Sequence, residues 1–113
     1  MAKINFDARG HAPVSHDDRV PAEYSKLTPA RRIAVRERYI ELQERRCWYC
    51  HHDLDFDPAP YVLAYKINWH AFPGRKHGFL KHPVHLHHDH ATDLTIGAVH
   101  AYCNAVLWQY HGE

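Results

Sequence analysis

The sequence of 113 residues predicts a small α+β domain with one basic helix, one β-hairpin and a second, C-terminal helix. The first observation is a helical pattern from Thr28 to about Arg46. The second is a strand, turn and strand pattern over residues 82–100, followed by helical spacing. The third is a pair of short motifs of metal-ligand type, which suits a chain too small to bury a large core.

The chain divides near residue 26. Residues 1–26 carry scattered Asp, Arg, His and Pro without a period, which predicts an extended or flexible N-terminal arm. Residues 27–113 are predicted to form the folded domain. The N-terminal residues have no apolar segment of signal-peptide type, and no stretch is long enough to span a membrane. We therefore expect a cytoplasmic protein without a membrane partner.

The first helix begins with Thr28 as its N-cap and Pro29 in its first turn. Its apolar stripe is imperfect, and its other faces are rich in arginine. The net charge of the chain is only +1, so overall charge does not indicate a nucleic-acid partner. The arginines could contact phosphate, or form a solvated face that neighbouring glutamates offset. The candidate DNA-binding residues are Arg31, Arg32, Arg36 and, in a later glycine-flanked loop, Arg75 and Lys76.

The three cysteines favour a metal site over a disulfide framework. Cys47-x-x-Cys50 is matched by His100-x-x-Cys103, and two such pairs can surround one tetrahedral zinc ion. A redox C-x-x-C would be expected in a βαβ setting, which the pattern lacks. Four protein ligands leave no open position, so Zn²⁺ here would stabilise the fold and take no part in chemistry.

The remaining segments are predicted from local pattern. Between the ligand pairs we expect a loop over residues 51–60, a short strand over Tyr61–Trp69 and a flexible basic loop over Phe72–Gly78. After them we expect a strand over His82–His88, a turn at 91–94, a strand over Thr95–His100 and a helix over Cys103–Tyr110.

The segment from His87 to Asn104 carries the chemical prediction. Adjacent residues of a strand face opposite sides, so His87 and His88 are expected to have different tasks. One can hold a metal ion while the other faces a nucleophile, and Asn104 can return an amide oxygen to the same ion. A histidine run alone is also typical of a surface tract or an adventitious metal patch, since the chain contains 13 histidines.

This segment resembles the HNH, or ββα-metal (His-Me finger), endonucleases, and in particular the phage recombination endonuclease VII branch. That branch has a pattern like D-H-D-H-x-T-G-x-V-R-G-L-L-C-x-x-C-N after an upstream C-x-x-C. The match runs without a gap from His87 to Asn104, and Cys47 and Cys50 supply the upstream pair. The resemblance covers about half of the chain and implies a small zinc-stapled ββα-metal domain with a preceding basic helix.

The resemblance implies a metal-dependent endonuclease that hydrolyses DNA phosphodiester bonds by a one-metal mechanism, nicking or cutting both strands. It assigns His87 and Asn104 to the catalytic divalent ion and His88 to the general base. His90 and Asp89 take supporting positions. Mg²⁺ or Mn²⁺ is the expected catalytic ion, and an imidazole ligand also favours Co²⁺ or Ni²⁺.

The sequence departs from the branch pattern at several positions. His87 stands where the branch usually has Asp, and His100 where it has Cys; both remain metal-competent. Asp93 replaces a turn glycine, and Asp tolerates left-handed backbone. Ile96 replaces an arginine, so one phosphate contact of the branch is not expected here.

The sequence is also compatible with two alternative functions. The chain could be a non-catalytic zinc module that binds nucleic acid, or one that binds a phage packaging or assembly partner. The nuclease hypothesis implies that DNA is the partner. It also implies that the protein acts in the cytoplasm of a bacterium or a phage-infected host cell. A homodimer is a further alternative to a partner of another kind.

Overall fold

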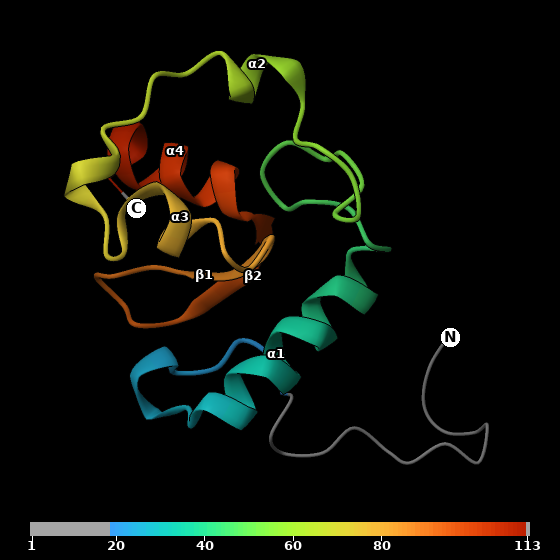
Figure 1. Ribbon diagram of the computed structural model, residues 1–113. Helices are drawn as coiled ribbons and strands as arrows, with labels where there is room; N and C mark the ends of the chain where they lie inside the picture. The colour runs from blue at the N-terminus through green and yellow to red at the C-terminus, as the bar shows by residue number, and fades with distance from the viewer. Residues whose placement is uncertain (1–18, 113) are drawn as a thin grey trace.

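The computed structural model describes residues 19–112 (Figure 1). Its class is α+β, as predicted, with a two-stranded sheet and four α-helices in the described part. In chain order the elements are η3 (Tyr24–Lys26), α1 (Pro29–Leu42), α2 (Pro60–Leu63), η4 (Trp69–Ala71), α3 (Arg75–Phe79), β1 (Val84–His88), β2 (Thr95–His100) and α4 (Ala101–His111), where η marks a 3₁₀ turn. None of the described helices is long and apolar enough to cross a membrane.

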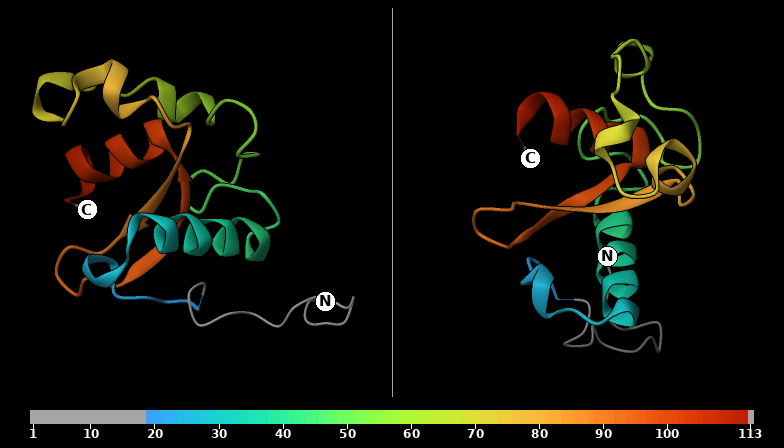
Figure 2. Two further views of the ribbon diagram at one scale, coloured as in Figure 1. Left: turned by 60° about the horizontal axis from the view of Figure 1, so that its bottom comes forward. Right: turned by 60° about the vertical axis from the view of Figure 1, so that its left-hand side comes forward.

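The hairpin of β1 and β2 lies between α1 on one side and α4 on the other (Figures 1 and 2). The core sits where these elements meet. It includes the fully buried Val35 from α1, Val99 from β2 and Val106 from α4. Each such side chain contributes roughly 1.5–3 kcal/mol by leaving water. The shorter helices α2 and α3 belong to the connection between α1 and β1, and α2 packs against α4.

The hairpin is antiparallel, and its register changes beside the predicted site. His87 lies opposite Gly97, but His88 lies opposite Thr95, so Ile96 has no partner of its own. An irregularity of this kind re-aims the side chains around it. In the turn between the strands, Asp93 has φ +65°, a left-handed backbone conformation that Asp tolerates better than most residues.

Residues 19–26 lie against this hairpin. The Thr95 backbone N–H donates to the Ala22 carbonyl at 2.9 Å, and the Ala22 N–H donates to Thr95 Oγ1 at 2.8 Å. The Tyr24 N–H donates to the Asp93 carbonyl at 2.7 Å, and the Ser25 hydroxyl donates to the Asp93 carboxylate at 2.6 Å. The end of the predicted arm is therefore part of the packed domain, while its residues 1–18 lie outside the described residues.

Two predictions for the connecting segment were wrong. The strand predicted over Tyr61–Trp69 is instead the helical turn α2 followed by η4, because Pro60 starts a helix and the described chain offers no strand for pairing. The loop predicted over Phe72–Gly78 contains most of α3, which begins after Gly74 turns the chain at φ +73°. Arg75 and Lys76 thus lie on a helix.

The remaining elements agree with prediction apart from their ends. The first helix ends at Leu42, short of Arg46, because Glu44 and Arg45 have positive φ and turn the chain. The strand predicted from His82 begins at Val84. The last helix extends two residues earlier and one later than predicted, over Ala101–His111.

Candidate metal sites and the histidine pocket

Four buried side chains form a group that could hold a metal ion. Cys47 and Cys50 come from the turn after α1, His100 ends β2, and Cys103 lies in the first turn of α4. Their ligand atoms all lie within 4.8 Å of one another. The backbone N–H of Trp48 donates to the Ala98 carbonyl at 2.9 Å, which holds the first pair against β2.

The distances in this Cys₃His group fit a tetrahedral ion. His100 Nδ1 lies 3.5 Å from Cys50 Sγ and 3.6 Å from Cys103 Sγ. Zinc bonds of about 2.3 Å to sulfur and 2.0–2.1 Å to nitrogen, at tetrahedral angles, separate those ligand atoms by about 3.6 Å. A structural metal such as zinc therefore fits this group without rearrangement of these pairs.

The surrounding hydrogen bonds orient the ligands. His100 Nε2 lies 2.9 Å from the carbonyl oxygens of both Asp53 and Phe56, so this nitrogen donates and leaves Nδ1 free to face an ion. Cys47 Sγ accepts from the backbone N–H of Tyr49 at 3.3 Å. The hydrogen bond between the two thiols lowers the pKa of Cys47 and raises the pKa of Cys103.

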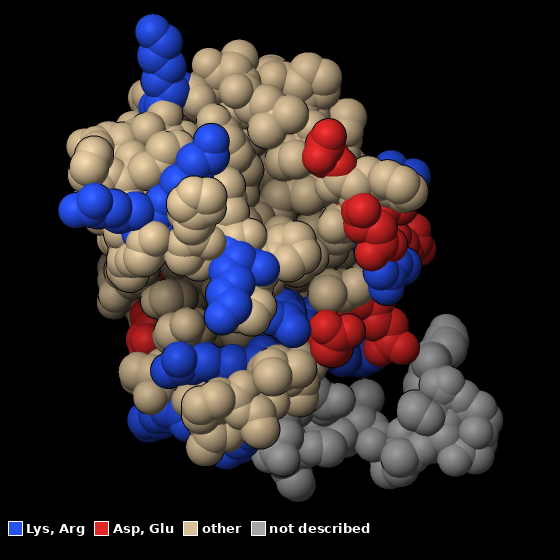
Figure 3. Space-filling view, in the orientation of Figure 1, with Lys and Arg blue, Asp and Glu red and all other residues tan. Residues whose placement is uncertain are grey.

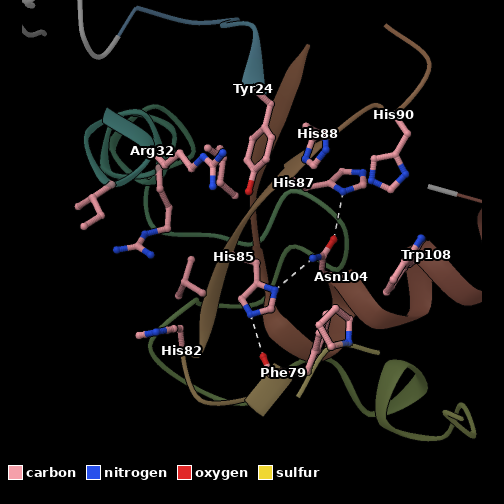
Figure 4. A pocket seen from close by; sticks show the side chains of 15 residues that line it. Tyr24, Arg32, Phe79, His82, His85, His87, His88, His90, Asn104 and Trp108 are labelled. Carbon is pink, nitrogen blue, oxygen red and sulfur yellow. Dashed lines mark hydrogen bonds between the residues drawn. The ribbon is translucent and has the colours of Figure 1, made fainter. Parts of the chain in front are cut away.

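A second cluster lines a pocket between α1, the hairpin and α4 (Figure 4). Imidazoles from β1 and the residues next to it dominate this histidine pocket, together with one carboxamide, two arginines and several aromatic rings. The lining includes Tyr24, Arg32, Arg36, His82, His85, His87, His88, His90, Asn104 and Trp108.

His87 and Asn104, the two predicted ligands of a catalytic ion, come together in this pocket. His87 Nδ1 lies 3.1 Å from Asn104 Oδ1. Adjacent ligand atoms of an octahedral ion with bonds of 2.0–2.1 Å are separated by about 3 Å, so the pair is spaced for a shared ion. His87 is 1% exposed, and the Trp48 ring lies 5.7 Å from it.

His85 belongs to the same cluster, although the sequence argument did not select it. Its Nδ1 lies 3.1 Å from Asn104 Nδ2, and its Nε2 lies 3.0 Å from the Phe79 carbonyl. Burial lowers the pKa of His85 to about 4, so its ring is neutral at neutral pH. The signal was present in the sequence, because His85 is two residues before His87 on a strand and so shares its face.

His88, the predicted general base, lines the pocket beside two other rings (Figure 4). The Tyr24 ring stacks on it at 3.7 Å with an interplanar angle of 5°, and His90 lies 4.7 Å away. Arg32 lies over the other side of this stack, 4.5 Å from the Tyr24 centroid. Burial, followed by the charges of His90 and His87, lowers the pKa of His88.

The supporting residues differ in what they contact. The His90 ring faces His88 and lies 6.4 Å from the Trp108 ring, so it shares the pocket. Asp89 was expected to orient an imidazole. Its carboxylate instead accepts the Ala91 N–H at 2.8 Å and closes the turn of the hairpin.

The predicted DNA-binding residues separate into two groups. Arg32 and Arg36 line the histidine pocket, while Arg31, Arg75 and Lys76 do not. The Nε atoms of Arg32 and Arg36 are buried and find no hydrogen-bond acceptor among the described residues.

No protein-family model, curated protein or solved structure matches this chain. Fold and site together define a small α+β protein with a buried Cys₃His group and a separate pocket rich in imidazole.

Proposed function

We propose that this protein is a metal-dependent HNH endonuclease that hydrolyses DNA phosphodiester bonds. The observation that carries the proposal is the 3.1 Å approach of His87 Nδ1 to Asn104 Oδ1 inside a pocket that also contains His88. A bound Mg²⁺ or Mn²⁺, or Co²⁺ or Ni²⁺ given the imidazole ligand, would neutralise charge on the phosphodiester.

His88 is the proposed general base. A neutral imidazole can take a proton from water near neutral pH, and His88 borders the same pocket as the two ligand residues. The parallel stack with Tyr24 restricts the ring to one plane, which suits a group that must meet a water molecule at a fixed angle.

Arg32 and Arg36 are the proposed phosphate contacts. Both line the pocket, and a guanidinium group can donate hydrogen bonds to phosphate oxygens. In the view of Figure 3, most Lys and Arg side chains lie over the left and centre of the molecule, including the region of α1, and most acidic side chains lie on the right. This local charge supports a polyanionic substrate in spite of the small net charge.

The first prediction concerns His88→Ala. We expect this variant to lose about 10²–10⁴-fold in cleavage rate, because a general base contributes that much to proton transfer. The measurement is conversion of supercoiled plasmid to nicked and linear forms with Mn²⁺, with and without chelator. The matched control is His77→Ala, which removes an exposed imidazole on α3 that does not line the pocket.

The outcomes separate the candidate functions. Equal rates for the wild type and His88→Ala would contradict the assignment of the base. The wild-type protein could also bind DNA without cutting it, whichever divalent ion is supplied. That result would contradict the nuclease and favour a non-catalytic zinc module that binds nucleic acid. A four-way junction in the same gel would reveal a preference for branched DNA.

A further inference from the structure

The carboxamide of Asn104 lies between two imidazoles, and its orientation decides which atom it offers to an ion. Oδ1 faces His87 Nδ1 at 3.1 Å, while Nδ2 faces His85 Nδ1 at 3.1 Å (Figure 4). The two ends of a carboxamide have nearly the same shape, so only their hydrogen-bond partners can fix which way the group points. In this chain the partner on the nitrogen side is His85.

The carbonyl of Phe79 fixes the tautomer of His85. His85 Nε2 lies 3.0 Å from that oxygen, and a carbonyl oxygen only accepts, so Nε2 must carry the hydrogen. In a neutral imidazole the other nitrogen is then an acceptor. Asn104 must therefore turn its N–H toward His85 and its oxygen toward His87.

We infer that His85 is a positioning residue that holds the Asn104 carboxamide with its oxygen toward the ligand atom of His87. Two hydrogen bonds connect these groups, one from His85 Nε2 to the Phe79 carbonyl and one from Asn104 Nδ2 to His85 Nδ1. The orientation follows from these hydrogen bonds alone, whereas its purpose rests on the proposed function, because an ion at His87 needs an oxygen from Asn104. Removing the partner that orients a metal ligand costs about 10–100-fold in metal affinity.

The test is a double-mutant cycle read by Mn²⁺ affinity, measured by calorimetry on the full chain with its Cys₃His metal in place. His85→Phe keeps a planar ring but removes both nitrogens, and we expect it to weaken Mn²⁺ binding by about 10–100-fold. Asn104→Asp presents an oxygen at either end and needs no orienting partner. In that background, we expect His85→Phe to change Mn²⁺ affinity by no more than about twofold.

The control is His77→Phe, which makes the same replacement at an exposed imidazole of α3 that does not line the pocket. It should leave Mn²⁺ affinity within about twofold of the wild type. Zinc content and melting temperature are measured for every variant. An equal loss from His85→Phe in both backgrounds would overturn the inference, since His85 would then bind the ion itself or only fill space. A comparable loss in His77→Phe would overturn it as well.

A second readout needs no variant and no added ion. Nitrogen-15 NMR of the wild type should show the Nε2–H tautomer at His85 and a scalar coupling from the Asn104 side-chain N–H to His85 Nδ1. The opposite tautomer would overturn the inference even if His85→Phe fails to fold. A wild type that neither binds Mn²⁺ nor cuts DNA would refute the proposed nuclease, while the NMR result would still decide the orientation of Asn104.

Discussion

The hydroxyl of Tyr39 joins α1 to the residue that pairs with His88 across the hairpin. It lies 2.9 Å from Thr95 Oγ1 and 3.1 Å from the Thr95 carbonyl. The same Oγ1 accepts the backbone N–H of Ala22. One buried side chain therefore connects α1, β2 and residues 19–26 next to the irregularity that positions His88.

We predict that Tyr39→Phe lowers the free energy of unfolding by about 1 kcal/mol, because a buried hydrogen bond is lost without a replacement. Denaturant unfolding of the metal-loaded protein measures this. The control is Tyr110→Phe, which removes a hydroxyl bonded to the Lys66 carbonyl at an exposed site and should cost less. A larger loss at Tyr110 would contradict this account of Tyr39.

The same variant should change how stability depends on pH. Burial raises the pKa of Tyr39 in the folded state, so ionisation of this phenol opposes folding. Its contribution is intact below the unfolded pKa of about 10 and is lost as pH rises above it. Wild-type stability should therefore fall more steeply than that of Tyr39→Phe above pH 10 or so. Parallel curves would show that the hydroxyl is solvated in the fold.

At the scale of elements, the Cys₃His group joins the end of α1 to the junction of β2 and α4. Each contributing segment is short, and the turn after α1 leaves the Trp48 and Phe56 side chains exposed. An ion at this group would fix the two halves of the domain relative to each other, and with them the positions of His87 and Asn104. We therefore expect the histidine pocket to form only when the Cys₃His group holds its metal ion.

We predict that Cys103→Ala reduces the bound zinc from one ion per chain to none and leaves the domain unfolded. Apparent zinc-binding energies of about 10–16 kcal/mol in finger peptides exceed the net stability of most domains, about 5–15 kcal/mol. Elemental analysis and far-UV circular dichroism measure the two effects. His111→Ala, at the exposed end of the same helix, should change neither. Folded wild-type protein without any metal would refute the prediction.

At the scale of the whole molecule, charge is distributed so that two arginines of α1 border the histidine pocket while the chain is nearly neutral overall. Of the two, Arg32 packs over the Tyr24 ring, which restricts its guanidinium group. A DNA backbone entering the pocket would meet both guanidinium groups. Residues on α3 such as Arg75 are exposed and outside this arrangement.

We predict that Arg32→Gln or Arg36→Gln weakens DNA binding and lowers the magnitude of the slope of log affinity against log salt by about 1, because each removes one phosphate contact. Binding is measured without divalent ions, so that no cleavage occurs. Arg75→Gln is the matched control and should have a smaller effect. If Arg75→Gln reduces the slope as much as Arg32→Gln, the interface lies over α3 and not at the pocket.

The sequence by itself determined the parts that depend on local spacing. The i, i+3 offset of each ligand pair and the alternation on either side of the turn predicted the Cys₃His group and the hairpin, and both are present. The meeting of His87 with Asn104 was also expected, because the helix follows β2 directly. Each ligand pair and the hairpin need only a few neighbouring residues to specify them, and the four ligands of a tetrahedral ion relate the two pairs although Cys50 and His100 are 50 residues apart.

Only the tertiary structure decided the rest. The role of His85 depends on a carbonyl six residues earlier in the chain, and the ring stacked on His88 comes from Tyr24, in a segment predicted to be an arm. Residues 61–79 form helical turns because no third strand is available to pair with them in the described domain. Such contacts arise from packing between distant segments, which the local pattern of side chains does not encode.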